Sequence, residues 1–514
     1  MKIFVQLLLA GCLAATACKK TETPTVPPEE FINEDPASFA EIGQIDIGET
    51  GAAEISAYDS LTQKLFVVNN AVSNDGDINK IDVIDLKNPA NPVYVTSISM
   101  APYGGAVNSV SVHNGKLAAA IQSLTKTNDG KVAVLKTTDH SEIKAVMVGA
   151  LPDMVTFSPD GKYIMTANEG EPNADYSVDP KGSISIIDVN NNYAVSTLFF
   201  DNHAGQAIAL KAKGFRIFGP TANPDFSSNI EPEYITISSD SKTAWVTLQE
   251  NNAIAKVNIT GKVITDIFPL GFKDYSLAGN EIDPTNDNDE YVAGKWNVKG
   301  VYMPDAIAIS EHNNIPYLFT ANEGDAREYD TYEEAKRAGH ADIILDPTAF
   351  PNAADLKKNA ALGRLNITTT LGDKDNDGDY DELYSFGARS FSVWNGLNGT
   401  QVFDSKNELD RKVNEADAYD DGRSDDKSIE PEGIAVGKVG NTNVAFVGME
   451  RVDAVAMYDI NDPQKPKFLQ IVKTGDAPEG VLFIAAKSSP TKKSLLIVSS
   501  EADGVVKIYT PKTL

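Results

Sequence analysis

The chain has 514 residues, a formal net charge of −28 from 73 acidic and 45 basic residues, and two cysteines, Cys12 and Cys18. This length is ample for a buried core, and the strong negative charge argues against nucleic acid or an anionic lipid surface as a partner. Because no cysteine follows position 18, disulfides, zinc–thiolate sites and thiol nucleophiles are excluded from the body of the chain.

The N-terminus is predicted to be a lipoprotein signal over residues 1–18. An apolar or small run over residues 3–17 is too short to span a membrane in the mature protein. Cys12, after Leu-Ala-Gly, is the closer match to a lipobox, whereas Cys18, after Ala-Thr-Ala, leaves a hydrophobic segment of normal length. We favour Cys18 for lipidation, with Cys12 as the alternative and an ordinary cleaved signal as a third reading.

Residues 19–37 are rich in Pro, Thr and Glu and are predicted to be a flexible tether. With the lipobox, this tether predicts an exported protein anchored to the membrane by lipid, at the outer membrane or cell surface. The anchoring leaflet, the oligomeric state and the ligand are not indicated by these features.

Seven repeats of short strands follow the tether. The unit is clearest over residues 151–200, where runs rich in β-branched and aromatic residues alternate with turn signals such as Asp160-Gly161, the pattern of a four-stranded antiparallel meander. The predicted strands are 53–60, 64–70, 80–86 and 93–100; 107–114, 116–123, 131–137 and 142–149; 154–159, 163–169, 183–189 and 194–200; 234–239, 243–250, 253–259 and 263–270; 306–310, 317–323, 389–395 and 400–405; 432–437, 444–450, 454–460 and 467–474; and 479–485, 494–500 and 505–510.

The last repeat lacks its fourth strand, and residues 39–47 can supply one before the first repeat. Such an exchange closes a ring and removes an exposed sheet edge. We therefore predict an all-β fold over residues 38–514: a seven-bladed β-propeller of four-stranded antiparallel blades, with a long insertion, 325–385, in the fifth blade. Helix is predicted only within that insertion, over 331–339 and 353–362.

Carboxylates recur at two fixed places in the repeat. One set precedes the innermost strand of each blade, and the other follows the next strand, so both are expected at one rim of the central channel. The first set is Glu54, Asp153, Glu233, Asp305, Glu432 and Glu479, with Asn108 in the second blade. The second set is Glu169, Glu250, Glu323, Glu450 and Glu501, with Asn70 and Gln122 in the first two blades.

Clustered carboxylates repel one another unless a cation neutralises them, and Ca²⁺ accepts many oxygen ligands in loose geometry. The rim is therefore a candidate calcium site, although each acid can instead accept hydrogen bonds from backbone N–H groups of the neighbouring blade. Arg327 and Arg389 are expected close to this rim, where either can pair with the carboxylates or hold an anionic substrate. Glu323, Arg327 and Arg389 are the candidate catalytic residues.

The sharpest local motif is DKDNDGDYDE at 373–382. Oxygen donors at alternate positions followed by Gly378 match the start of an EF-hand-type calcium loop, but Tyr384 stands where a true EF-hand has its bidentate Glu. The motif therefore predicts a shorter calcium loop that fixes the insertion. Its predicted ligands are Asp373, Asp375, Asp377, Asp379 and Asp381. Two other acidic stretches, 283–290 and 417–426, lack this spacing and are interpreted as solvated loops.

Long strings of the sequence resemble the choice-of-anchor I proteins, bacterial surface propellers related to the mesenchyme-specific cell-surface glycoproteins. The matching strings lie at 151–172, 303–330, 362–396, 427–460 and 477–484, and the resemblance spans nearly everything after residue 40. It implies a surface-attached propeller. Some members are labelled atypical alkaline phosphatases, and propeller phytases hydrolyse phosphoesters at a calcium-loaded acidic rim, but no catalytic residues carry over individually.

Two functions follow from these observations. The first is a calcium-binding surface module that engages an extracellular glycan, mineral or protein. The alternative is a calcium-dependent phosphomonoesterase, in which rim calcium polarises the phosphoryl group and activates water. The sequence carries no serine-hydrolase elbow, Walker loop or dinucleotide fingerprint, and few basic residues are expected near the rim, which favours the binding module.

Overall fold

The computed structural model describes residues 33–73, 76–77, 79–221 and 224–514. The predicted signal, both cysteines and most of the tether lie outside these ranges. Within them, no helix combines the length and apolar character needed to cross a bilayer. Glu34 is 3% exposed and its carboxylate accepts hydrogen bonds from the backbone N–H (2.8 Å) and Oγ (2.6 Å) of Ser494. Chain packing therefore begins ahead of residue 38.

Four-stranded antiparallel sheets repeat along the described chain, with strands paired in chain order. Each strand is short and rich in Val, Ile, Ala and aromatic residues, which suits a pleated surface buried between neighbouring sheets. Six sheets comprise β2 (Ala52–Asp59), β3 (Lys64–Asn69), β6 (Lys80–Asp85) and β7 (Val93–Ser99); β8 (Val107–His113), β9 (Lys116–Ile121), β10 (Asp129–Lys136) and β11 (Glu142–Ala150); β12 (Pro152–Phe157), β13 (Tyr163–Asn168), β14 (Ser183–Asp188) and β15 (Ala194–Phe199); β16 (Pro232–Ile237), β17 (Thr243–Leu248), β18 (Ala253–Asn258) and β19 (Val263–Pro269); β22 (Ile307–His312), β23 (Ile315–Asn322), β29 (Ser390–Asn395) and β30 (Gln401–Asp404); and β31 (Pro431–Val439), β32 (Thr442–Met449), β33 (Ala454–Asp459) and β34 (Lys467–Lys473).

One further four-stranded sheet joins the two ends of the described chain. It contains β35 (Pro478–Ile484), β36 (Leu495–Ser500), β37 (Val505–Thr510) and β1 (Ala40–Asp46), and β1 pairs antiparallel with β37. The predicted closure by an N-terminal strand is confirmed. This pairing covers the edge that β37 would otherwise expose.

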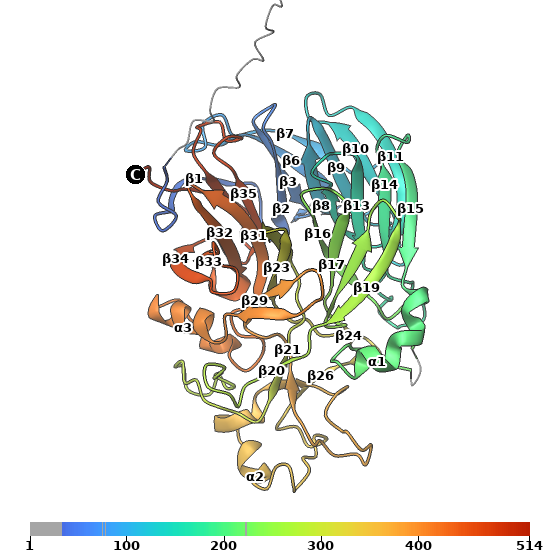
Figure 1. Ribbon diagram of the computed structural model, residues 1–514, viewed down its shortest axis with the longest axis vertical. Coiled ribbons are helices and arrows are strands. Elements are labelled where there is room, and N and C mark those ends of the chain that lie inside the picture. Colours follow the sequence, from blue (N-terminus) through green and yellow to red (C-terminus); the bar gives the residue numbers. More distant parts are fainter. Residues whose placement is uncertain (1–32, 74–75, 78, 222–223) are drawn as a thin grey trace, which may run out of the picture.

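The first strands of these sheets contact one another in cyclic order, β2 with β8, β12, β16, β22, β31, β35 and back to β2. An apolar cluster fills each space between neighbouring sheets, for example Met165 and Ile184 against Val246 and Ala255. Radial sheets around a closed ring of inner strands are the arrangement of a β-propeller, which is visible in the upper body of Figure 1.

A separate five-stranded sheet lies below the ring in Figure 1, together with α2 (Ala353–Leu356). Its strands come from two segments that interrupt the repeat, with β21 parallel to β28 and the other pairs antiparallel. It has its own core, which includes Tyr275, Phe350 and Leu365. The strands, in sheet order, are β20 (Phe272–Asp274), β21 (Lys299–Val301), β28 (Tyr384–Ser385), β27 (Asn366–Thr368) and β26 (Ala335–Arg337).

The helix predictions were partly wrong. Residues 331–339 form β25 (Tyr332–Glu333) and β26 instead of a helix, because β25 pairs with β24 (Glu328–Tyr329) and β26 pairs with β27. The second predicted helix is divided into α2 and a π-helical turn at Asn359–Gly363. Two helices were not predicted, α1 (Ala207–Lys211) and α3 (Glu408–Glu415), and both lie in segments that connect sheets.

The remaining elements are short. A two-stranded sheet pairs β4 (Val72–Ser73) with β5 (Gly76–Asp77). Single 3₁₀ turns occur at Asp201–Gln206, Asp421–Arg423 and Glu450–Val452.

Candidate functional site: a carboxylate rim

β-Bulges aim the first set of carboxylates. In the inner strands, pairing with the next strand shifts register at the acidic position: between Pro152 and Met154 around Asp153, and between Pro478 and Gly480 around Glu479. Equivalent shifts surround Glu54, Glu233 and Glu432. A bulge releases a side chain from the regular alternation of a strand and re-aims it. The bulges therefore allow these acids to leave the faces packed between sheets.

A residue with left-handed backbone dihedral angles lies two positions before several of these acids. Leu151 (φ 46°), Met303 (φ 45°), Glu430 (φ 46°) and Ala477 (φ 55°) stand before Asp153, Asp305, Glu432 and Glu479, respectively. Each such non-glycine conformation costs about 1–2 kcal/mol. The same strained turn in four sheets indicates that the rim geometry is maintained at the expense of local stability.

The second set of carboxylates lies at the same end of the sheets. Glu169 follows β13, Glu250 follows β17, Glu323 follows β23 and Glu501 follows β36, while Glu450 begins the 3₁₀ turn after β32. The start of an inner strand lies beside the end of the antiparallel strand that follows it, as in Pro431 beside Met449. This register explains why sets distant in the repeat share one rim.

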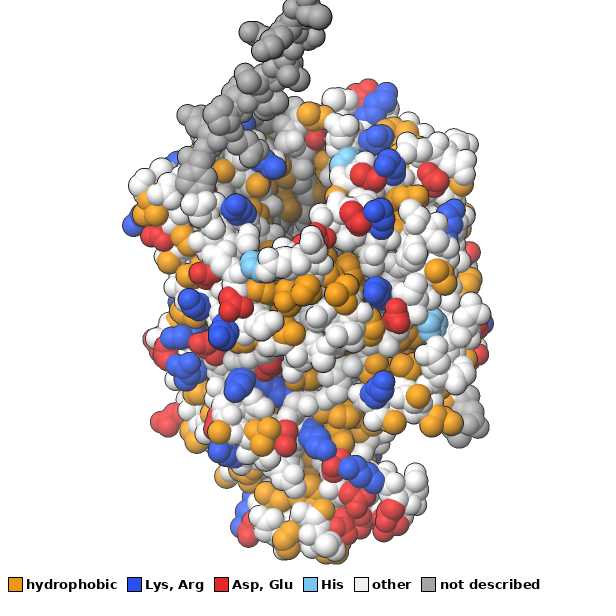
Figure 2. Space-filling view, viewed as in Figure 1, with side chains coloured by type: hydrophobic (Ala, Val, Ile, Leu, Met, Phe, Trp, Pro, Cys, Tyr) orange, Lys and Arg blue, Asp and Glu red, His pale blue; other side chains and the backbone are white. Residues whose placement is uncertain are grey.

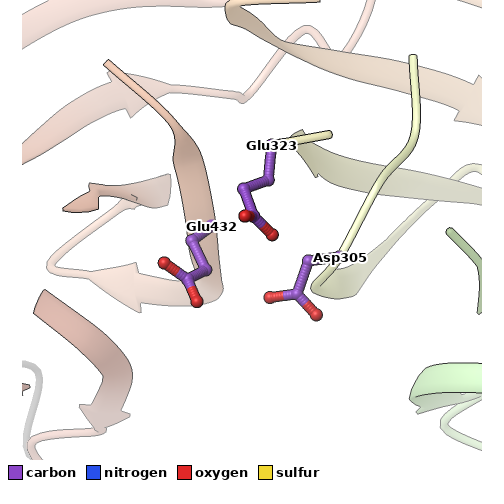
Figure 3. A group of neighbouring side chains, drawn as sticks. All are labelled: Asp305, Glu323 and Glu432. Carbon is purple, nitrogen blue, oxygen red and sulfur yellow. The ribbon is translucent and has the colours of Figure 1, made fainter. Parts of the chain in front are cut away.

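Three carboxylates converge on one point of this rim. Asp305 precedes β22, Glu323 follows β23 and Glu432 lies on β31, and one oxygen from each lies within 4.8 Å of the others. Figure 3 shows the three side chains directed toward a common space. Within the described residues, the Oε2 atom of Glu432 is buried without a hydrogen-bond partner. This orphaned oxygen and the convergence fit a cation with oxygen ligands.

Two residues that were not predicted contact Glu323. Gln249 Nε2 donates to Glu323 Oε2 at 2.8 Å, and Lys427 Nζ lies 2.9 Å from Glu323 Oε1. Lys427 also lies 3.1 Å from Glu430, which forms a second carboxylate group with Glu323 and Glu450. No repeated sequence position marks Lys427, because it comes from the irregular segment before β31.

Burial raises the pKa values of the rim carboxyls, and neighbouring carboxylates raise them further. Burial followed by repulsion from Glu501 raises the pKa of Glu54 to about 8. The pKa values of Asp305 and Glu432 are raised well above their ordinary values by burial and then by the charge of Glu323. In the absence of a cation, the rim therefore holds protons at neutral pH.

Asn70 and Asn108, two of the three amides that replace acids in the first two repeats, make local contacts. Asn70 Nδ2 lies 3.0 Å from a carboxylate oxygen of Glu54 and 2.7 Å from the Val107 carbonyl. Asn108 Nδ2 donates to the Pro152 carbonyl at 3.2 Å. These donors tie neighbouring inner strands together, so the first two sheets provide amide contacts where the others provide carboxylates.

Arg327 and Arg389 are buried and engaged, which does not fit the predicted role of holding an anion. Arg327 forms an ion pair with Glu231 (Nη2–Oε2 2.8 Å) and donates to the Phe218 and Asn229 carbonyls. Arg389 is 1% exposed and donates to the carbonyls of Asp283, Ser424 and Asp426. Arg327 therefore pairs with a buried carboxylate, which is one of its two predicted roles, whereas Arg389 fastens connecting segments to the ring.

The 373–381 loop brings three of its five acids together. Carboxylate oxygens of Asp373, Asp375 and Asp377 lie within 4.8 Å of one another. The loop is closed by hydrogen bonds from Gly378 N to Asp373 Oδ2 (3.1 Å) and from Lys374 N to Asp381 Oδ2 (2.9 Å). Repulsion from Asp377, followed by partial desolvation, raises the pKa of Asp375. Figure 2 shows acidic side chains gathered at the lower end of the molecule.

The acidic stretches 283–290 and 417–426 are neighbours in the structure. Asp289 and Glu290 from the first, and Asp417, Asp420 and Asp421 from the second, line one cavity of about 580 Å³. Tyr291 and Tyr419 meet edge to face in its wall, with ring centroids 4.8 Å apart. The interpretation of these stretches as separate solvated loops is therefore incomplete.

Comparisons with known proteins show which family the chain belongs to. The family model of the choice-of-anchor I domain matches residues 54–463. Gigasin-3a of Magallana gigas is 28% identical over 189 residues, 30% of this chain and 66% of that protein. The mesenchyme-specific cell surface glycoprotein of Strongylocentrotus purpuratus is 24% identical over 344 residues, 57% of this chain and 44% of that protein. The chain thus spans less than half of the second relative.

Solved structures that resemble the chain include hydrazine synthase of Kuenenia stuttgartiensis, with a TM-score of 0.49 and 11% identity over 91% of this chain and 98% of that chain. The WD40 domain of coronin from Toxoplasma gondii has a TM-score of 0.47 and 7% identity, covering 94% of this chain and 89% of that chain. The fold assignment depends on the ring of sheets described above. Because the family model covers most of the chain, this protein belongs to the choice-of-anchor I domain family.

Proposed function

We propose that this protein is a calcium-binding cell-surface propeller that acts as a binding or adhesion module. In this proposal its seven four-stranded sheets are seven blades, Cys18 (or Cys12) carries the lipid anchor, and calcium organises one rim. The cyclic contacts among seven inner strands support the blade number. The printed name of one relative, a cell surface glycoprotein, supports the location.

The convergence of Asp305, Glu323 and Glu432 is the observation that carries the calcium proposal. Their oxygens lie within 4.8 Å of one another, and the described residues place one cation, Lys427, on Glu323. At an effective dielectric constant of about 20, two unit charges 4.8 Å apart repel by about 3.5 kcal/mol. A divalent cation replaces that repulsion with attraction.

A second calcium is proposed in the 373–381 loop. Asp373, Asp375 and Asp377 would supply side-chain oxygens, with Asp379 and Asp381 completing the set through a carbonyl or water. Asp373 Oδ1 is buried without a hydrogen-bond partner in the described structure, which supports a ligand role. This calcium would hold the five-stranded sheet in place, since Tyr380 from the same loop packs against its core.

The partner of the module is proposed to be an extracellular glycan, mineral or protein. An acidic rim that holds Ca²⁺ can share the ion with an anionic group of such a partner, because Ca²⁺ accepts six to eight ligands.

The alternative function is a calcium-dependent phosphomonoesterase. Lys427 and Arg451 favour it: Lys427 pairs with Glu323, and Arg451 Nη1 lies 2.8 Å from Glu450. These cations take the place of Arg327 and Arg389 as groups that could contact a phosphate. Both, however, already pair with Glu430, which reduces the positive charge available to a substrate.

Calorimetric titration of the chelator-stripped protein with Ca²⁺ tests the proposal. We expect two binding events, one lost in Glu432→Gln and the other in Asp375→Asn. A chromogenic phosphomonoester, assayed with calcium and with chelator, separates the two functions. Turnover that needs calcium and disappears in Lys427→Met would favour the hydrolase, whereas absence of any calcium binding would refute both.

A further inference from the structure

Two neighbouring cavities lie in the central channel, and the side chains that line both of them form a collar. Two cavities inside the ring share Ile55, Ser109, Met154, Tyr234 and Val481 in their walls. On one side of this collar lies a small cavity of about 50 Å³ that includes Asp153, Asp305 and Glu479. On the other side lies a chamber of about 460 Å³, at the far ends of the inner strands.

The chamber has a chemistry opposite to that of the rim. None of the described residues that line it is charged, although 23% of the chain is Asp, Glu, Lys or Arg. Hydroxyl groups come from three neighbouring strands: Ser56 on β2, Ser109 and Ser111 on β8, and Thr156 on β12. Figure 2 shows a hollow in the upper half of this face, over the region where Figure 1 places β2 and β8.

One lining hydroxyl keeps unused hydrogen-bonding capacity. Ser111 Oγ accepts from Phe157 N at 3.2 Å, which leaves its O–H to donate. A ligand oxygen that accepts from Ser111 therefore gains a hydrogen bond worth about 0.5–1.5 kcal/mol net. Ser56 Oγ and the Tyr58 hydroxyl also lack partners among the described residues, but both atoms are fully buried and have no surface open to the chamber.

Aromatic surface completes the chamber. Tyr58, Tyr234 and Phe483 line it, and Phe483 is supported by stacking on Phe446 with ring centroids 5.3 Å apart. Aromatic faces accept the C–H face of a sugar ring, while hydroxyls pair with its O–H groups. The volume lies within the range of ligand pockets, about 300–1,000 Å³.

We propose that this chamber binds a neutral saccharide of one or two units. A phosphate or carboxylate ligand would be desolvated there without a counter-charge, and a purely apolar ligand would leave the Ser111 donor unpaired. The inference builds on the proposed binding role by naming a ligand class and a second site. Saccharide binding in the chamber does not need the rim cation, because none of the rim carboxylates lines the chamber.

Saturation-transfer NMR on the full chain with cellobiose, maltose, lactose and chitobiose, followed by calorimetry, tests the proposal. We expect saturable binding of at least one of these, in calcium and in chelator alike, and none of glucose 6-phosphate. Thr156→Val removes one lining hydroxyl at nearly constant volume and should weaken binding about tenfold, the equivalent of one hydrogen bond. Thr265→Val, on the exposed outer strand β19, is the matched control.

Ser111→Leu, which removes a donor and places a larger apolar side chain in the chamber, should abolish binding while the melting temperature shows that the variant folds. Equal binding of the methyl glycoside would support the end of a longer glycan as the ligand, and its loss would support a free reducing sugar. Absence of binding for all four disaccharides and their monosaccharides would overturn the proposal. Binding that vanishes in chelator would also overturn it, because it would assign the sugar to the rim while leaving the calcium proposal intact.

Discussion

Replacing Glu432 with glutamine should change the stability of the protein in opposite directions with and without calcium. The substitution keeps the size of the side chain and removes one of three converging charges. In chelator at pH 8 it eliminates repulsion with Asp305 and with Glu323, so the variant should be more stable than wild type. In calcium it loses a charged ligand, so the ion should stabilise the variant less.

The magnitude follows from the distance of at most 4.8 Å between the carboxylate oxygens. Two repulsions of about 3.5 kcal/mol each, taken at that outer distance, sum to about 7 kcal/mol for fully ionised groups. Burial and then the charge of Glu323 raise the pKa of Glu432, so retained protons already relieve part of this repulsion, and we expect a gain of about 1–3 kcal/mol. An unfolding entropy of about 2.1 cal/mol/K per residue converts this gain to about 1–3 °C in melting temperature.

Differential scanning calorimetry in EDTA and at 100 times the calcium dissociation constant measures both effects. One bound ion at that concentration stabilises by about 2.7 kcal/mol, or about 3 °C here. The wild type, with two proposed sites, should gain about twice the shift of Glu432→Gln. Asp266→Asn, on the exposed outer strand β19, is the control and should follow wild type. A lower melting temperature for Glu432→Gln in EDTA, or an undiminished calcium shift, would refute the reasoning.

Three further predictions concern pH, the loop and a buried ion pair. In chelator, stability should fall from pH 5 to pH 8, because burial raises the pKa of Glu54 to about 8 and that of Glu450 to about 7, so the folded state binds more protons than the unfolded chain in this window; calorimetry across pH should show a shallower fall in calcium. Asp375→Asn should abolish one calcium event and leave saccharide binding unchanged, as titration calorimetry would show. Arg327→Met should destabilise by about 3–5 kcal/mol at pH 8, measured by denaturant unfolding, because it leaves Glu231 buried and unpaired; the loss should shrink at pH 5 and in the double variant with Glu231→Gln.

The sequence alone determined the repeated four-stranded sheets of this protein, but not the five-stranded sheet formed by the two segments that interrupt the repeat. Short β-branched runs between turn signals recur with one period, and each run pairs with its neighbour in the chain, so local pattern predicts each sheet. Because the last repeat lacks a fourth strand, the sequence predicts that the strand at 39–47 closes the ring, and β1 does pair with β37. Helices were less predictable, since residues 332–337 join sheets through partners distant in sequence, such as β27.

The recurring acids were also visible in the sequence, because a repeated position in a ring returns to the same rim. Which of these acids converge on one point could not be predicted from the sequence. Which three carboxylates converge depends on the bulges at the inner strands and on the order of sheets around the ring. Lys427 reaches Glu323 across 104 positions of sequence, Arg327 pairs with Glu231, and Arg389 bonds to backbone carbonyls of connecting segments.

The carboxylate rim shows most clearly what the sequence determines and what only the tertiary structure decides. Periodicity determines that acids recur, because each repeat is built by local pairing. Only the tertiary structure decides which of them meet, which are paired with cations and where the uncharged chamber lies, because charge interactions and cavities depend on distances between residues that the chain order does not specify.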